Sequence, residues 1–348
     1  MQRVTLLVAF FCSLSCSAFL PRNRLPSPRS TRRWQSTATS SDIRLLRGGA
    51  TASIATTSQL GASLAMADIS RDAACAAFGL VGATVWLKLW TVLAAKGAVD
   101  PKLSRKIVHS GSAPLFMLTW PFFSGTAHAR FVAALVPAAF MCRLLLARYG
   151  KQPELVKAIS RSGDDSEATG GPFLYVLVLI ALTLGAWRDS LISVVAVSQM
   201  ALGDGFADII GRRFGKAGKW PACFGMRVHS KSFAGSAAFF VSGFLGSLGL
   251  VAWFNHFGCL SLPGFSSQAG NLLHWAPYSG SLTAKLFLIS LVVSAVELVP
   301  IGDDNLTVPA ASIILTTTFL GGNRSAGFLM ATMLMATNFF ISMRHNED

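Results

Sequence analysis

Charged residues are scarce in this sequence. Only 13% of its 348 residues are Asp, Glu, Lys or Arg, while 52% are hydrophobic; a typical soluble domain carries about 25% charged residues. The hydrophobic residues are gathered into long runs along the chain. This composition excludes an ordinary soluble domain and predicts that lipid surrounds most of the chain.

Four further absences narrow the fold class and the chemistry. The six cysteines form no CxxC pair and have no metal-ligand spacing, so a zinc site is not expected. No segment alternates apolar and polar residues as the strands of a membrane β-barrel do. The run from Gly211 to Lys216 is one residue short of a P-loop and lacks its Ser or Thr. The catalytic signatures of protein kinases are missing as well.

The formal net charge of +14 raises the question of a nucleic-acid partner. Neither half of the chain shows the interleaved basic and aromatic residues of a nucleic-acid binder, so we expect no such partner. Residues 19–67 are rich in Ser, Thr, Ala and Arg, contain no Lys and have one acid, Asp42. That composition is typical of a plastid transit peptide, which we expect to be disordered.

Residues 1–18 have the pattern of a signal peptide. Arg3 precedes the short apolar run 4–14, and small residues follow. The junction Ser17-Ala18-Phe19-Leu20-Pro21 resembles the Ala-Phe-x-Pro cleavage motif of bipartite plastid presequences. A secretory signal followed by a disordered linker is the alternative. In both cases the functional domain is predicted at 68–348.

The rest of the chain is a succession of apolar segments. Because no strand pattern occurs, we predict an all-α, polytopic transmembrane helical bundle of about 7–9 spans. The segments are 73–95, 107–123, 130–147, 172–187, 190–203, 233–256, 285–301, 307–321 and 325–343.

Counting the segments assigns the loops to two sides. If all of them cross, one side receives the loops 96–106, 148–171, 204–232 and 302–306, which carry most of the Lys and Arg residues. By the positive-inside rule this face is the stroma or its cytosolic equivalent. Nucleotides are found on the same side.

The richest polar cluster lies on that face. Asp204 and Asp208 are four residues apart, so on a helix they share one side, and Arg212 continues the row. Two carboxylates with several cations are what a magnesium nucleotide requires, because Mg²⁺ prefers oxygen ligands and phosphates need fixed cations. The glycines Gly211, Gly215 and Gly235 would let backbone approach a phosphate. The alternative is an interfacial cluster of ion pairs.

Two smaller clusters accompany it. Glu297 ends an apolar segment, and the turn Asp303-Asp304-Asn305 follows. A solvated turn with Asn305 capping the next helix is the alternative. At the start of another segment stand Arg105, Lys106 and His109. The two cations can reach phosphate, while His109 is either catalytic or a hydrogen-bonded packing residue.

These clusters, in this order, resemble the phytol kinase family, within the polyprenol kinase group that includes farnesol and dolichol kinases. The matching elements span residues 100 to 320. They are Ser104-Arg105-Lys106-x-x-His109, Pro121-Phe122-Phe123-Ser124-Gly125, Gly171-Pro172-Phe173-x-Tyr175, Gly203-Asp204-Gly205-x-Ala207-Asp208-x-x-Gly211-Arg212-x-Phe214-Gly215, Lys231-Ser232-x-Ala234-Gly235-Ser236, and Val296-Glu297 with Asp303-Asp304-Asn305-x-x-Val308-Pro309.

The resemblance implies transfer of the γ-phosphate of CTP to the C1 hydroxyl of phytol in a plastid membrane. The product, phytyl phosphate, would serve tocopherol and phylloquinone synthesis from chlorophyll-derived phytol. Two departures from the family pattern bear on nucleotide and alcohol specificity. Trp220-Pro221 stands where Pro-Tyr-Asn is usual, and Leu298 where Ser is usual.

Phosphoryl transfer requires in-line placement and cancellation of phosphate charge. We assign Mg²⁺ to Asp204 and Asp208, with Asp304 completing the site, and the alcohol proton to Asp304 or Glu297. The alcohol's tail would lie between helices. The residues expected to bind CTP are Arg105, Lys106, Arg212, Arg213, Lys216, Lys231 and Ser232, together with the three glycines Gly211, Gly215 and Gly235.

Two other functions share features of this pattern. A CDP-lipid synthase, which is a cytidylyltransferase, also combines a carboxylate-bearing helix with a Gly-Arg-x-x-Gly-Lys run, but releases pyrophosphate. The turn at Asp303 and the entry at Arg105 favour the kinase. A membrane transporter would carry charges in mid-span and internal symmetry. Here the charges gather at one face, and no symmetry is visible.

Overall fold

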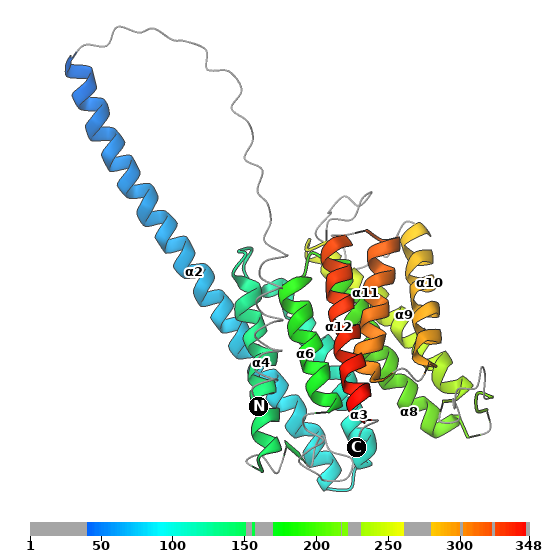
Figure 1. Cartoon of the computed structure of the whole chain (residues 1–348). Helices are drawn as coiled ribbons and strands as arrows, with labels where there is room; N and C mark the ends of the chain where they lie inside the picture. Colours follow the sequence, from blue (N-terminus) through cyan, green and yellow to red (C-terminus); the bar gives the residue numbers. More distant parts are fainter. Residues whose placement is uncertain are drawn as a thin grey trace.

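The structure is a computed structural model that describes residues 40–150, 155–156, 170–216, 218–221, 231–260, 280–299, 302–321 and 324–345. This part of the chain is built from helices and contains no strand (Figure 1). The helices are α2 (Ser40–Ala95), α3 (Pro101–Met117), α4 (Ala129–Arg148), α6 (Gly171–Gly185), α7 (Leu191–Val197), α8 (Asp204–Phe214), α9 (Phe233–His256), α10 (Gly280–Glu297), α11 (Asp304–Phe319) and α12 (Arg324–His345), with the 3₁₀ turn η1 (Trp120–Phe122) and the π-helical turn η3 (Ser198–Gly203).

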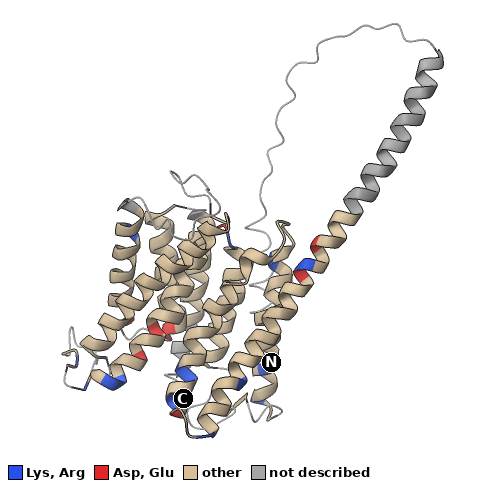
Figure 2. Cartoon of the chain, turned by 180° about the vertical axis from the view of Figure 1, so that it is seen from behind, with Lys and Arg blue, Asp and Glu red and all other residues tan. Residues whose placement is uncertain are grey.

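The predicted all-α membrane bundle is confirmed. Each predicted apolar segment coincides with a helix, and α7, η3 and α8 follow one another without a break. Within the described ranges, four helical stretches can cross a membrane by length and composition. They are Ser63–Ala95, Ala129–Arg148, Leu191–Phe214 and Phe233–His256. Figure 2 shows long stretches of these helices without any charged residue. The number of spans stays a prediction.

Helix α2 begins earlier than the sequence indicated. We expected the first apolar segment at 73 and residues 19–67 without regular structure, whereas the structure is helical from Ser40. No proline occurs between Pro28 and Pro101, and alanine, the strongest helix former, is frequent there. Residues 1–39, with the predicted signal peptide, lie outside the described residues. The assignment of 19–67 as a transit peptide stays a prediction.

The start of α3 explains why its polar residues stand at one end of the bundle. The Asp100 side chain accepts hydrogen bonds from the backbone N–H groups of Lys102 and Leu103, and Pro101 fills the first helical position. Ser104 Oγ donates to the Trp90 carbonyl of α2 at 2.8 Å. The first two turns of α3, which contain Arg105, Lys106 and His109, are thereby fixed.

The other end of α3 has its own polar cluster, which we call the distal staple: Asp72, Ser124 and Arg188. The buried Asp72 carboxylate accepts hydrogen bonds from Ser124 N at 2.6 Å and Ser124 Oγ at 2.7 Å. The Arg188 guanidinium donates to the carbonyls of Trp120, Phe123 and Ser124. These bonds fasten the turn after α3 to α2 and to the segment before α7.

Candidate active site

The π-helical turn η3 divides one long helix into two unlike halves. Before it, the residues from Ile192 to Val197 are buried. After it, α8 buries only Gly205 and Ala207 and presents Asp204, Asp208 and Arg212 to a cavity. A π-helical turn is a rare distortion that is often found at functional sites. Here it stands immediately before Asp204.

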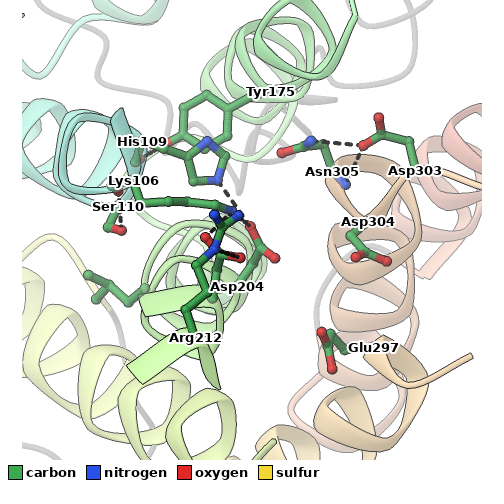
Figure 3. A network of polar contacts seen from close by, with 12 residues as sticks. Lys106, His109, Ser110, Tyr175, Asp204, Arg212, Glu297, Asp303, Asp304 and Asn305 are labelled. Atoms are coloured by element: carbon green, nitrogen blue, oxygen red, sulfur yellow. Dashed lines mark hydrogen bonds and ion pairs between the residues drawn. The ribbon is translucent and has the colours of Figure 1, made fainter. Parts of the chain in front are cut away.

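Asp204 faces two cationic or potentially cationic side chains from α3. Lys106 Nζ and His109 Nε2 each lie 3.4 Å from Asp204 Oδ2 (Figure 3). Asp208, one turn further along α8, accepts from Arg212 Nε at 2.8 Å, and Lys106 Nζ is 3.8 Å from its Oδ2. That second oxygen is buried and accepts no hydrogen bond from the described residues. Its neighbour is the Lys106 ammonium, at ion-pair distance.

Lys231 connects the second carboxylate cluster to the first. It precedes α9, and its ammonium forms ion pairs with Glu297, at the end of α10, and with Asp304 Oδ2 at 3.0 Å. Burial alone would lower the pKa of Lys231, but the two carboxylates outweigh it and hold that pKa above its ordinary value. Lys231 is therefore a fixed positive charge between them.

Three carboxylates from three helices converge in this place. One carboxylate oxygen each of Asp204, Glu297 and Asp304 lies within 4.8 Å of the other two. We predicted Asp204, Asp208 and Asp304 as the metal ligands, and that set stays a prediction. In the structure Glu297 lies close to Asp204 and Asp304, and Asp208 is paired with Arg212. Clustered carboxylate oxygens are the donor set that Mg²⁺ prefers, so the residues present fit this ion.

The predicted glycines pack against Ser232. A Cβ on Gly215 would lie 2.2 Å from Ser232 Oγ, and one on Gly235 would lie 3.0 Å from the Ala207 carbonyl of α8. Ser232 also caps α9, because its Oγ accepts a hydrogen bond from Gly235 N. Gly211 is in the same contact. The glycines thus let α8 and α9 touch, which positions Lys231; a direct approach to phosphate stays a prediction.

All these groups open into one cavity of about 840 Å³. The structure does not bring Arg213, Lys216 or Gly215 to its wall: Arg213 stacks on the Phe214 ring, 5.6 Å from its centroid. The predicted residues that do line the cavity are Arg105, Lys106, His109, Asp204, Asp208, Gly211, Arg212, Lys231, Ser232, Gly235, Glu297 and Asp304.

Several cavity residues were not among the predicted site residues. The Tyr175 hydroxyl donates to the His109 carbonyl at 2.8 Å and accepts from Ala113 N, so it holds α3 against α6. The sequence signal that could have identified Tyr175 as a site residue was its place in the motif Gly171-Pro172-Phe173-x-Tyr175. Asp303, not Asn305, caps α11, and both residues line the cavity. Lys219 also lines it and was noted only as part of the basic face.

The segment that departs from the family pattern packs on the start of α9. The Trp220 ring lies 4.1 Å from the Phe233 ring, and its indole N–H donates to Ser236 Oγ. Trp220 thereby fixes the chain next to Lys219 and Ser236, which line the cavity.

A helical membrane bundle with carboxylates and cations at one end of a partly apolar cavity belongs to the class of membrane proteins that bind amphipathic ligands. It suits a ligand that joins a phosphate-bearing group to an apolar one. Sequence comparison agrees. The chain is 36% identical to a probable chloroplastic phytol kinase of Zea mays over 262 residues, which cover 74% of this chain and 80% of that protein.

Other relatives carry the same name. A probable chloroplastic phytol kinase of Triticum aestivum is 38% identical over 72% of this chain and 78% of its own. Phytol kinase 1, chloroplastic, of Arabidopsis thaliana is 33% identical over 77% of this chain and 83% of its own. The chain belongs to the phytol kinase family. No protein-family profile matches it, and no solved structure does.

Proposed function

We propose that the chain is a CTP-dependent phytol kinase that transfers the γ-phosphate of CTP to the C1 hydroxyl of phytol. The observation that carries this proposal is the single cavity in which Asp204, Glu297 and Asp304 converge beside Lys106 and Lys231. Family membership supports the reaction, and the resemblance described above supports CTP as the donor. A plastid membrane is the proposed location, with the charged end of the bundle in the stroma.

The charged end supplies the requirements of phosphoryl transfer. Asp204, Glu297 and Asp304 would hold Mg²⁺, which when bound neutralises charge that develops on the phosphate oxygens. Lys106 and Lys231 flank these carboxylates and would bind the triphosphate. Arg212, held by Asp208, adds a planar donor suited to a phosphate. Because the helices fix these groups before the nucleotide arrives, little reorganisation is needed during the reaction.

The acceptor hydroxyl must lose its proton as the phosphorus–oxygen bond forms. His109, Glu297 and Asp304 are the candidate acceptors. Glu297 and Asp304 are engaged by Lys231, whereas His109 is oriented by Asp204 and is followed on α3 by the cavity residues Ser112 and Phe116. We therefore place His109 as the proton acceptor, with Asp204 orienting its ring.

The test is phosphoryl transfer in membranes that contain the full chain. Phytol, farnesol and geranylgeraniol are offered with γ-labelled CTP or ATP and Mg²⁺. Label in the lipid fraction that is lost in Asp204→Asn supports the kinase and ranks its substrates. Pyrophosphate release from CTP with phosphatidic acid, without lipid label, would make the chain a cytidylyltransferase. Uptake into vesicles without nucleotide turnover would make it a transporter.

A further inference from the structure

The cavity changes character along two of its walls. On α3, Arg105, Lys106 and His109 line the charged end, and Ser112 and Phe116 line the part beyond. The twelve residues from Arg105 to Phe116 extend roughly 16 Å along a helix. We call the part of the cavity beyond His109 the apolar arm. On α6 the same change runs from Tyr175 to Val176 and Leu179.

Two more helices contribute apolar residues to the arm. Val136, Pro137 and Phe140 of α4 line it, and so do Ala83 and Leu87 of α2. A Cβ on Gly79 of α2 would lie 3.3 Å from Val136, so these two helices are in direct contact beside the arm.

The arm offers nothing for a polar ligand. Among the described residues that line the cavity beyond His109 on these four helices, none is charged. The one hydroxyl of this part of α3, that of Ser112, donates to the Val108 carbonyl at 2.6 Å. An apolar space of this kind binds hydrocarbon, because removal of apolar surface from water is favourable.

We propose that the apolar arm holds the isoprenoid chain of the acceptor alcohol, and that Val136 and Phe140 of α4 determine which chains fit. The proposal rests on the proposed function. Its occupant is argued from continuity: the cavity that contains His109 and Asp204 is the one that the apolar residues of α2, α3, α4 and α6 line. The hydroxyl end of the alcohol and its branched hydrocarbon chain would thus be recognised by different parts of one cavity.

A pair of neighbouring substitutions tests this assignment. Val136→Phe narrows the arm, because Val136 is 5% exposed and lines it, whereas Leu135→Phe adds a ring at a position that is 58% exposed and outside the cavity. We measure kcat/KM for phytol and for geraniol in membranes with equal amounts of folded protein. In Val136→Phe the ratio of phytol to geraniol should fall about tenfold or more. In Leu135→Phe it should stay unchanged, as should the KM for the nucleotide in both variants.

A widening variant covers the case in which Val136→Phe does not fold. Phe140→Ala enlarges the arm and should shift the ratio toward longer or bulkier alcohols than wild type prefers. An equal loss for phytol and geraniol in folded Val136→Phe, or no change of the ratio in either variant, would overturn the proposal. An unchanged ratio of phytol to geraniol in a Val136→Phe protein that has lost a co-purifying acyl lipid would also overturn the proposal. The arm would then hold a structural lipid.

A second readout does not depend on turnover. A photoactivatable C20 alcohol should label α4 or α6 peptides in wild type, and less so in Val136→Phe, with Leu135→Phe as the control. Labelling confined to lipid-facing positions would contradict the proposal. Labelling of α4 and α6 without phosphate transfer from any nucleotide would support the apolar arm as the binding site of the isoprenoid chain but would refute the kinase function.

Discussion

The two ends of α3 carry polar clusters of opposite design. At the distal staple, Asp72 and Arg188 are satisfied by the backbone and hydroxyl of a single turn, with bonds of 2.6–3.1 Å. At the cavity end, carboxylates from α8, α10 and α11 face one another and are balanced by side-chain cations. Burial of charge is therefore not in itself a sign of function. In a structural cluster the charged groups are satisfied by hydrogen bonds to the backbone. In a binding cluster, like charges lie close together beside a cavity.

The largest effect is expected from the cavity end. Asp204→Asn keeps the shape of the side chain but removes the charge that faces Lys106 and His109. Transfer of label from CTP to phytol should fall about 10²–10³-fold, while the melting temperature of the solubilised protein stays close to wild type. A variant that melted early and kept its activity per folded molecule would show that Asp204 belongs with the structural clusters.

The distal staple should respond in the opposite way. Asp72→Ala leaves the buried Ser124 N–H and hydroxyl without their acceptor, which costs about 1–3 kcal/mol of folding free energy. We expect a lower melting temperature and unchanged transfer per folded molecule. Loss of transfer at full stability would mean that the distal turn takes part in the reaction.

Helix α9 reaches from one end of the bundle to the other, and two glycines allow a matched comparison: Gly215, which follows α8 and packs against the start of α9, and Gly249 within α9. Gly215→Ala forces a methyl group against Ser232, at the start of α9, and should cost about 1–3 kcal/mol and displace Lys231. Gly249→Ala, near the distal end of α9, meets nothing within 4 Å and should be neutral in both stability and transfer. Equal effects at the two positions would refute the close contact of α8 with α9.

The smallest effect is expected within the cavity end itself. Arg212→Gln and Arg213→Gln remove the same charge from neighbouring positions, but only Arg212 lines the cavity. The KM for the nucleotide should rise about fivefold in Arg212→Gln and change by less than about twofold in Arg213→Gln, because Arg213 lies outside the cavity. A larger effect of Arg213→Gln would restore it to the predicted phosphate-binding group.

The sequence predicted the helices well because apolar runs are a local property. The start of α2 at Ser40 escaped prediction, because transit-peptide composition and a strong helix former coincide there. The site was predicted as a set of residue types on one face. The spacing of four residues led us to group Asp208 with Asp204 as metal ligands, because both lie on the same side of one helix. The ion pairs that assign Asp208 to Arg212 and bring Glu297 across from α10 depend on contacts far apart in the sequence.

The π-helical turn has a consequence for how such a site arises. One extra residue in a helix rotates everything after it by about 100° around the axis. Loss of a single codon between Ser198 and Gly203 would therefore swing Asp204 and Asp208 together away from the cavity, with every other residue intact. Gain of that codon would do the reverse. Evolution could thus create or erase this carboxylate face through an insertion or deletion, in one step and without any substitution.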